Sequence, residues 1–313
     1  MKLFIIGGEG FIGSHICRRF LGNGHHVTVY GPRFEENLLS DIERAIQKVE
    51  GDILDFSSLQ KAMEASQADV VIHLAAYGQG KDGVAKSAQR SPQKAIEVNI
   101  TGFHHVVVAA KTAGIKRMVW SGSTTVFGFD EDYKVPTVPE DVRLNPATFY
   151  GLTKVMNEAM TRYYCQDGIE ICGLRLPLVY GPGRWYKGAG STLVDIFERA
   201  YSPEVIEISG GDELIDLMYV KDVAKAFYEV AVTKAQISEV YNVKSHTTSM
   251  KEIVEIVKEI VPESQLHLKK TESSSLYPLV DCTKIEQEIG FVPDYSIEEA
   301  CRDYLSEVNK KFN

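Results

Sequence analysis

The stretch KLFIIGGEGFIG, residues 2–13, decides the fold of this chain. Its apolar start predicts a β-strand, and the FIGSHICRRFLGNG that continues it predicts a helix. Between the two, Gly7, Gly10 and Gly13 follow the spacing G-x-x-G-x-x-G. Glycines in such a turn let the backbone approach a pyrophosphate, which then sits at the helix N-terminus. The stretch therefore predicts a dinucleotide site, with a tight turn of no binding role as the alternative.

Strand-like and helix-like segments alternate onward from this stretch. The expected strands are KLFIIG, HHVTVY, QKVEGD, DVVIHLAA, KRMVWSGS and IEICGLRL, and the two long expected helices cover about 92–113 and 147–166. The nearly all-apolar DVVIHLAA is typical of a strand that is covered on both faces. Alternation of this kind predicts an α/β fold with a doubly wound parallel sheet, the Rossmann arrangement.

The regular alternation fades after Pro177. We expect a dinucleotide-binding Rossmann domain over residues 1–176 and a smaller C-terminal substrate lobe over 177–313. Segments near 215–243 are expected to return to the Rossmann domain. Short helices are expected at about 192–200, 221–232, 249–260 and 296–308.

Composition narrows the classes of protein to consider. The 313 residues are 44% hydrophobic and 25% charged, with a net charge of −9, which argues against a nucleic-acid binder because phosphates call for a basic face. The apolar run at the start is short and is followed by Glu9, so we interpret it as a strand and not a signal peptide. No apolar run reaches the roughly 18 residues of a membrane span, so we expect no membrane association.

The cysteines and histidines point to a reduced, metal-free protein. There are five cysteines, an odd number, and no C-x-x-C pair, so we expect free thiols and a cytoplasmic location. The histidines lack the spacing of metal ligands with a cysteine or carboxylate, so we expect no metal site.

Tyr150 and Lys154 in FYGLTK lie four residues apart on an expected helix and so face the same way. A nearby ammonium favours the phenolate, so the pKa of Tyr150 is expected to fall towards neutrality and make the phenol a proton carrier. Ser123 ends the strand KRMVWSGS, at the sheet edge where ligands bind, and can hydrogen-bond a reacting oxygen. A Y-x-x-x-K pair alone is also common on protein surfaces.

Together these motifs resemble a known family, the extended short-chain dehydrogenase/reductases, which includes NAD(P)-dependent epimerases and dehydratases. The resemblance covers nearly the whole chain. It rests on GGEGFIG, GDILD, HLAA at 73–76, VNITG, SGSTTVFG, YGLTK, LRLPLVYGPG, DLMYVKDVAKA, YNV at 241–243 and DCTKIEQEIGFVPDYSIEEA. It implies Ser123, Tyr150 and Lys154 as the catalytic residues. It also implies a homodimer through about 92–113 and 148–166.

The residues expected to bind ligands follow from the motifs and this resemblance together. Those expected to bind the cofactor are Gly7, Gly10, Phe11, Ile12, Gly13, Arg33, Asp52, Ile53, Leu74, Ala75, Ala76, Asn99, Tyr150, Lys154 and Pro177. Those expected to bind the substrate are Tyr77, Ser123, Thr124 and Arg184. For Asp52 a helix-capping or loop role is the alternative, and for Ala75 and Ala76 simple packing is equally plausible.

Three departures from the family pattern narrow the chemistry. Family dehydratases carry Asp-Glu after the catalytic hydroxyl, whereas this chain has Thr124-Thr125, which argues against dehydration. Many sugar-nucleotide enzymes have Asn and Arg for the substrate diphosphate at the positions of Leu178 and Ile215. Arg184 or Lys187 in GPGRWYKG could compensate, with a solvated loop charge as the alternative. A substrate without a nucleotide is therefore expected.

The end of the second expected strand, VTVYGPR, bears on the cofactor. Gly31 stands where an acidic residue would bond the ribose hydroxyls of NAD, and Arg33 follows. A guanidinium can bind a 2′-phosphate, so NADP is the expected cofactor, with NAD as the alternative and an outward-facing turn arginine as the other interpretation of Arg33.

The sequence thus predicts an NAD(P)-dependent oxidoreductase that moves hydride between the nicotinamide and a secondary alcohol or ketone of a small molecule. One alternative is a nucleotide-sugar 4-epimerase, which oxidises and re-reduces the same carbon. An alternative of another class is a non-catalytic NAD(P)-binding sensor.

Overall fold

The computed structural model describes residues 1–32, 37–186, 188–269 and 277–310. Within these residues a seven-stranded sheet runs in the order β10-β6-β5-β4-β1-β2-β3, with every neighbouring pair parallel. Its strands are β1 (Lys2–Ile6), β2 (His26–Gly31), β3 (Gln47–Glu50), β4 (Val70–His73), β5 (Arg117–Ser123), β6 (Glu170–Leu176) and β10 (Val240–Asn242). The predicted doubly wound parallel sheet is confirmed.

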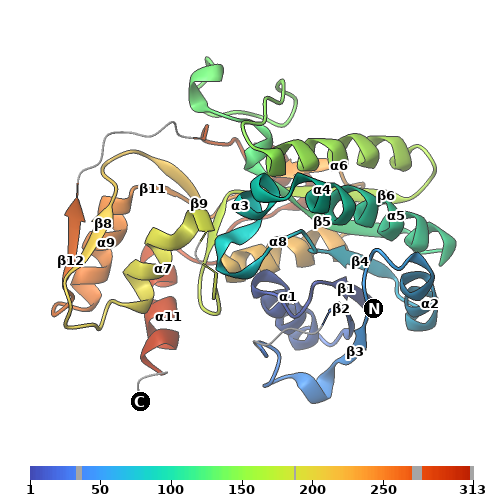
Figure 1. Ribbon diagram of the computed structural model, residues 1–313, viewed down its shortest axis with the longest axis horizontal. Helices are drawn as coiled ribbons and strands as arrows, with labels where there is room; N and C mark the ends of the chain where they lie inside the picture. The colour runs from blue at the N-terminus through green and yellow to red at the C-terminus, as the bar shows by residue number, and fades with distance from the viewer. Residues whose placement is uncertain (33–36, 187, 270–276, 311–313) are drawn as a thin grey trace.

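Helices cover both faces of the sheet, as Figure 1 shows. They are α1 (Phe11–Gly22), α2 (Phe56–Ser66), α3 (Gly83–Arg90), α4 (Pro92–Ala95), α5 (Gly102–Thr112), α6 (Phe149–Cys165) and α8 (Val220–Val232), with a π-helical segment η3 (Ile96–Thr101) between α4 and α5. Leu3 and Ile5 of β1 pack in one core with α1 and α8, and Phe4 and Ile6 pack in another with α5. The period of two along an apolar strand thus supplies both cores.

The smaller lobe lies to the left in Figure 1. It contains α7 (Ser191–Glu198), α9 (Met250–Ile260) and α11 (Ile297–Asn309), with β8 (Ile206–Ser209) parallel to β12 (Leu266–Lys269). A further sheet runs β11-β9-β7, from His246–Thr248, Ile215–Tyr219 and Leu178–Tyr180, and α10 (Thr283–Ile289) packs beside β10. The lobe has a core of its own, in which the rings of Phe197 and Tyr304 stack 4.5 Å apart.

The chain does not keep the two parts apart in sequence. Strand β10 pairs with β6 at the edge of the large sheet, and α8 packs against α1. Both come after β7, β8 and β9 along the chain. The division of the chain at residues 176 and 177 remains our proposal. Of the segments expected to return, Val240–Asn242 joins the large sheet and Val220–Val232 packs on α1, whereas Ile215–Tyr219 lies in the three-stranded sheet.

Candidate active site

The glycine turn after β1 has the geometry that a dinucleotide cradle needs. Gly7 has a φ of 79°, in the left-handed region, and its amide donates to the Tyr30 carbonyl at 3.0 Å. A Cβ at Gly13 would lie 2.3 Å from the Gly7 carbonyl oxygen, so no other residue lets α1 begin so close to the turn. Glycine at position 13 therefore allows the first turn of α1 to pack directly against the glycine loop.

The N-terminus of α1 is open to an anion. Helix α1 lies wholly in the described part of the chain, and it has neither an acidic residue in its first turn nor a side chain capping its amides. Its N-cap is Gly10, and Phe11 and Ile12 follow. The free N–H groups and the positive end of the helix dipole suit a pyrophosphate, so the residues present fit a nicotinamide dinucleotide.

The residues expected around the adenine ribose are only partly described. Gly31 ends β2 without a carboxylate, and Arg33 lies outside the described residues. Asp52 is exposed, and its Oδ1 accepts a hydrogen bond of 2.9 Å from the Leu54 amide, so it caps its own loop. Ile53 is buried in the core on the α5 face. An adenine contact of Asp52 stays a prediction beside this observed local role.

The loop after β4 packs against the glycine turn and is joined to α6 by hydrogen bonds of Asn99. Leu74, Ala75 and Ala76 begin this loop, and a Cβ on Gly7 would lie 3.2 Å from the Ala75 amide nitrogen. Asn99, buried in the π-helical segment, accepts a hydrogen bond of 2.7 Å from the Tyr77 amide and donates one of 3.1 Å to Thr153 Oγ1. The side chain of Asn99 therefore positions the loop. A direct cofactor contact of Asn99 stays a prediction.

Tyr150 and Lys154 occupy successive turns at the start of α6. Thr148 caps this helix, because its Oγ1 accepts a hydrogen bond of 3.0 Å from the Gly151 amide. Lys154 is 2% exposed, and its Nζ donates to the Ser121 carbonyl at 2.7 Å. The same Nζ lies 5.4 Å from the centre of the Tyr150 ring. The lysine thus fastens the helix to β5 and stands beside the phenol.

Ser123 ends β5 on the same side of the site. A Cβ at Gly151 would lie 2.4 Å from the Thr125 carbonyl oxygen, so α6 begins against the turn that follows Ser123. The Ser123 hydroxyl accepts hydrogen bonds from the Thr125 amide at 3.2 Å and from its hydroxyl at 2.9 Å. The structure therefore gathers the three residues implied as catalytic at one sheet edge.

The electrostatics of this pair differ from the expectation. Burial raises the pKa of Tyr150 above its ordinary value, with a further rise from the neighbouring Tyr186, and burial lowers the pKa of Lys154 to about 7. The predicted fall in the pKa of Tyr150 is therefore wrong for the protein alone. The reason is that loss of hydration disfavours the phenolate and the ammonium alike, and an ammonium that is half neutral near pH 7 stabilises the phenolate little.

The residues expected to bind the substrate differ in burial and in their hydrogen-bond partners. Thr124 Oγ1 donates to the Leu176 carbonyl at 3.5 Å, next to Pro177, and the Tyr77 hydroxyl donates to Gln79 Oε1 at 3.1 Å. Arg184 is 7% exposed, with its guanidinium donating to the Val179 carbonyl. The solvated alternative for Arg184 is therefore wrong, because its loop folds back over it. Lys187 lies outside the described residues.

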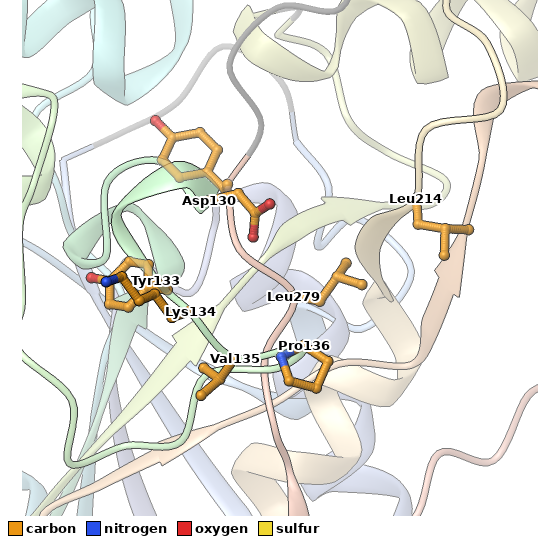
Figure 2. Close-up of a pocket in the computed structure, with 8 residues that line it drawn as sticks. Asp130, Tyr133, Lys134, Val135, Pro136, Leu214 and Leu279 are labelled. Carbon is orange, nitrogen blue, oxygen red and sulfur yellow. The ribbon is translucent and has the colours of Figure 1, made fainter.

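A cavity of about 350 Å³ lies at the start of β9, next to Ile215 (Figure 2). Its lining is mostly apolar and aromatic, namely Asp130, Tyr133, Lys134, Val135, Pro136, Leu214, Tyr277 and Leu279. Sequence reasoning missed this cavity, because it joins three segments that are far apart in the chain. Leu178 is paired with Leu217, two residues beyond Ile215, so both departures from the family pattern lie at this end.

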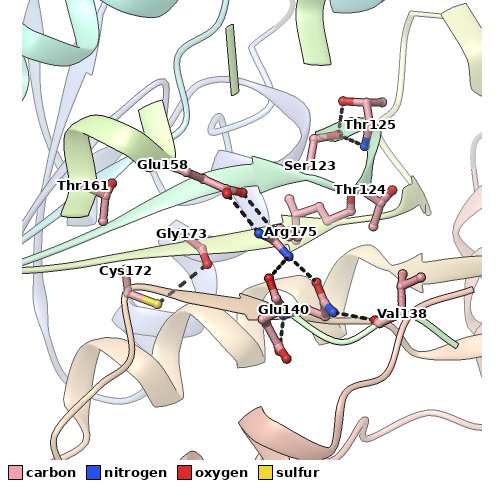
Figure 3. A network of polar contacts seen from close by, with 12 residues as sticks. Ser123, Thr124, Thr125, Val138, Glu140, Glu158, Thr161, Cys172, Gly173 and Arg175 are labelled. Atoms are coloured by element: carbon pink, nitrogen blue, oxygen red, sulfur yellow. Dashed lines mark hydrogen bonds and ion pairs between the residues drawn. The ribbon is translucent and has the colours of Figure 1, made fainter. Parts of the chain in front are cut away.

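Behind the site, Arg175 of β6 and Glu158 of α6 form a buried ion pair that sequence reasoning also missed (Figure 3). Two hydrogen bonds of 2.8 and 2.9 Å join the guanidinium to the carboxylate, and both side chains are 2% exposed. The guanidinium also donates to the Glu140 carbonyl at 3.1 Å and lies 4.8 Å from the Phe127 ring centre. The pair fixes α6, and with it Tyr150 and Lys154, against the sheet.

Across 1–32, 37–186, 188–269 and 277–310, no three His, Cys, Asp or Glu residues are placed to hold a metal ion together. Among the helices of those same ranges, none has the length and apolar character needed to cross a membrane.

Comparison with known proteins decides the family. The sequence model of the "NAD dependent epimerase/dehydratase family" matches residues 3–243. The chain belongs to this family. Its members are extended short-chain dehydrogenase/reductases, so the chain is an enzyme that uses a nicotinamide dinucleotide to transfer hydride, and the prediction of this class is confirmed.

Other members of the family match along nearly their whole length. UDP-glucose 4-epimerase of Lactobacillus helveticus is 27% identical, over 94% of this chain and 93% of its own. A putative UDP-glucose 4-epimerase of Methanocaldococcus jannaschii is also 27% identical, over 96% of each chain. These names describe the reaction of the relatives. The substrate of the present enzyme has to be inferred from its own site.

Solved structures of two family members share the fold. UDP-glucose 4-epimerase of Thermotoga maritima, solved with UDP-glucose, superposes with a TM-score of 0.87 at 24% identity, over 100% of each chain. The Thermus thermophilus enzyme, in complex with NAD, gives a TM-score of 0.84 at 21% identity, over 99% of each. The family is described as NAD dependent, and these comparisons lend no support to the predicted preference for NADP.

Proposed function

We propose that this enzyme is a sugar 4-epimerase, which oxidises a secondary alcohol and re-reduces the same carbon from the other face. The gathering of Tyr150, Lys154 and Ser123 beside the glycine cradle supports this proposal, and it is the observation that carries it. The epimerase names of the relatives favour this reaction over a net oxidation. Among the reactions open to the family, dehydration is disfavoured because Thr124 and Thr125 carry no titratable group near pH 7.

The chemistry assigned to each residue follows from its surroundings. Tyr150 accepts the proton of the substrate hydroxyl, and Ser123 hydrogen-bonds the oxygen as it becomes a carbonyl. A bound nicotinamide would supply reversible hydride transfer at the carbinol carbon of the substrate. Lys154, with a pKa of about 7, exchanges a proton near neutral pH and favours the phenolate when it is charged. In the reduction Tyr150 returns its proton to the oxygen, so atoms and charge balance over the cycle.

The experiment that tests this proposal separates epimerisation from net redox chemistry. The purified enzyme with NAD is given UDP-glucose, UDP-galactose and the corresponding free sugars and sugar phosphates, and products are identified by NMR while nicotinamide absorbance is recorded. Formation of the 4-epimer with no net change of absorbance supports the proposal. Stoichiometric reduction of NAD with release of a ketone overturns it in favour of a dehydrogenase.

A second candidate is a net dehydrogenase or reductase that acts on a small hydroxy or keto compound without a nucleotide. Ile215 and Leu178 favour it, because neither supplies the bidentate phosphate contact that an arginine gives. Calorimetry with UDP and GDP distinguishes the two: weak or absent binding favours this candidate, and tight binding favours a nucleotide sugar.

The choice of dinucleotide is a separate proposal. Gly31 removes both the bond to the ribose hydroxyls and the repulsion of a 2′-phosphate, so we propose that NADP is accepted at least as well as NAD. Fluorescence titration of both cofactors, with Arg33→Ala as the variant, tests it. A selective loss of NADP affinity supports the proposal, and equal losses or a wild-type preference for NAD contradict it.

We also propose that the enzyme is a cytoplasmic homodimer. All five cysteines are free thiols, which agrees with a reducing compartment. On α6, Leu152 and Met156 are each 43% exposed and Tyr163 is 66% exposed. Their spacing of four and seven residues places them along one side of the helix, which suits a helix-to-helix contact with a second copy.

A further inference from the structure

The segment Gly181–Tyr186, which follows β7, leaves the lobe and lies against the Rossmann domain. We call it the strap. Its first anchor is His15 of α1, whose Nε2 donates to the Pro182 carbonyl at 3.0 Å. A Cβ at Gly183 would lie 3.7 Å from a Leu38 methyl carbon, so the strap also passes close to the chain that follows β2. It therefore meets the large domain near both the first helix and the second strand.

The end of the strap lies close to both ends of the site. The Tyr186 ring makes an edge-on contact with the ring of Phe11, the first residue of α1, and the two ring centres are 6.3 Å apart. The phenol of Tyr186 also lies near enough to Tyr150 to raise its pKa. Tyr186 thus packs against the first residue of α1, at the glycine cradle that suits a pyrophosphate, and its phenol acts electrostatically on Tyr150.

Arg184 holds the strap in this shape. Its guanidinium lies 4.8 Å from the centre of the Tyr186 ring, and its Nε donates to the Tyr186 carbonyl at 3.3 Å. A Cβ at Gly190 would lie 2.4 Å from the guanidinium carbon, so the small residue there makes room for the buried side chain. Because Arg184 donates to the Tyr186 carbonyl within the strap and to the Val179 carbonyl of β7 just before it, the chain itself holds the strap in this shape and no substrate is needed to order it.

From these contacts we propose that the strap covers the bound dinucleotide and retains it through turnover, with Tyr186 as a residue that touches it. The proposal rests on the proposed function in one respect, that the cofactor spans from the glycine cradle to Tyr150. Release then requires the His15 bond and the Phe11 contact to break. Retention matters to an epimerase, because the same cofactor molecule must return the hydride that it accepted, whereas a dehydrogenase must exchange its cofactor after each turnover.

The dissociation rates of NAD and NADH test the strap directly. Each is measured by stopped-flow fluorescence after displacement by excess competing nucleotide, on the full chain and on His15→Ala and Tyr186→Ala. We expect release to quicken about tenfold in each variant, the size expected from one hydrogen bond or one aromatic contact. Tyr186→Phe, which keeps the ring, is expected to release the cofactor nearly as slowly as the parent protein. His267→Ala, on the exposed strand β12, is the matched control for His15→Ala.

The outcomes separate this proposal from the proposed function. Circular dichroism and thermal unfolding establish that each variant is folded, and Tyr186 is only half-buried, so Tyr186→Ala keeps the test open if His15→Ala does not fold. Unchanged dissociation rates in folded Tyr186→Ala overturn the strap while leaving the epimerase intact. Failure of the parent protein to bind NAD or NADP overturns the proposed function as well. Slow release combined with net NAD reduction supports the strap and contradicts the epimerase.

Discussion

Tyr150 and Lys154 show how burial acts in opposite directions on an acid and a base one helical turn apart. The phenol becomes a weaker acid and the ammonium a stronger one, so near neutral pH the protein alone holds the phenol protonated and the lysine close to its midpoint. The charge of a bound ligand therefore decides whether Tyr150 or Lys154 carries the proton. The sequence revealed the two residues and their spacing, but their burial depends on the packing of α6 against β5.

Replacing Tyr150 with Phe tests the proton carrier. The ring still packs, so we expect cofactor affinity to be nearly unchanged, while turnover falls by roughly 100-fold or more because general acid–base catalysis is lost. Steady-state kinetics and a cofactor titration measure the two effects. Tyr163→Phe, on the exposed side of the same helix, is the matched control. Retention of more than about a tenth of the activity by Tyr150→Phe would show that another group carries the proton.

The buried His73 and the partly buried His15 predict acid sensitivity of the fold. Burial lowers the pKa of His73 to about 3, with a further contribution from the Lys154 ammonium, and burial lowers the pKa of His15 to about 4. In the unfolded chain both titrate near pH 6.5, so the unfolded state binds more protons below that pH. Stability therefore falls as the pH drops from about 6.5 towards 4, by up to about 1.4 kcal/mol per pH unit for each histidine.

Urea unfolding at several pH values between 7 and 5 measures this slope. We expect His73→Leu to flatten it relative to the parent protein, because the neutral side chain no longer gains a proton on unfolding. His267→Ala, in an exposed strand, should leave the slope unchanged. An equal slope in His73→Leu would mean that other groups account for the acid sensitivity.

At the scale of elements, the sequence predicted the parts that have a strong local signal. β1 and β4 are nearly continuous apolar runs, and the helices that cover them have clear limits, so the large sheet could be expected. The lobe strands β7 and β11 have three residues each, too few to establish a period. The π-helical turn at Asn99 interrupts a segment that the sequence predicted as one helix, and only its contacts with Tyr77 and Thr153 explain it.

The ion pair that joins α6 to β6 provides an element-scale prediction. Glu158→Gln leaves the Arg175 guanidinium buried without its counter-charge, so we expect a loss of about 3–5 kcal/mol in the free energy of unfolding. The double replacement Arg175→Met with Glu158→Leu should cost less, because it removes both charges. Chemical denaturation measures the differences. The exposed pair Arg199 and Glu204 is the control, and equal losses in the single and double variants would contradict a buried-charge penalty.

We propose that the whole molecule forms a homodimer, and the exposed apolar residues of α6 allow this to be tested. Leu152→Glu with Met156→Glu introduces four like charges at a two-fold contact, so we expect the protein to become monomeric. Light scattering coupled to gel filtration measures the mass. Leu268→Glu, also an exposed apolar residue but on β12 of the lobe, should leave the mass unchanged. A parent protein that is monomeric at micromolar concentration would end the proposal of a dimer.

The position of β10 at the edge of the sheet has a consequence for biosynthesis. A ribosome delivers β6 long before β10, and until then the newly made sheet has an unpaired edge and α1 lacks its partner α8. Open strand edges invite pairing with other nascent chains. A truncated gene product that stops at residue 176 is therefore expected to accumulate as aggregate or chaperone complex, because only a chain that extends past Asn242 can pair the edge of β6 and cover α1.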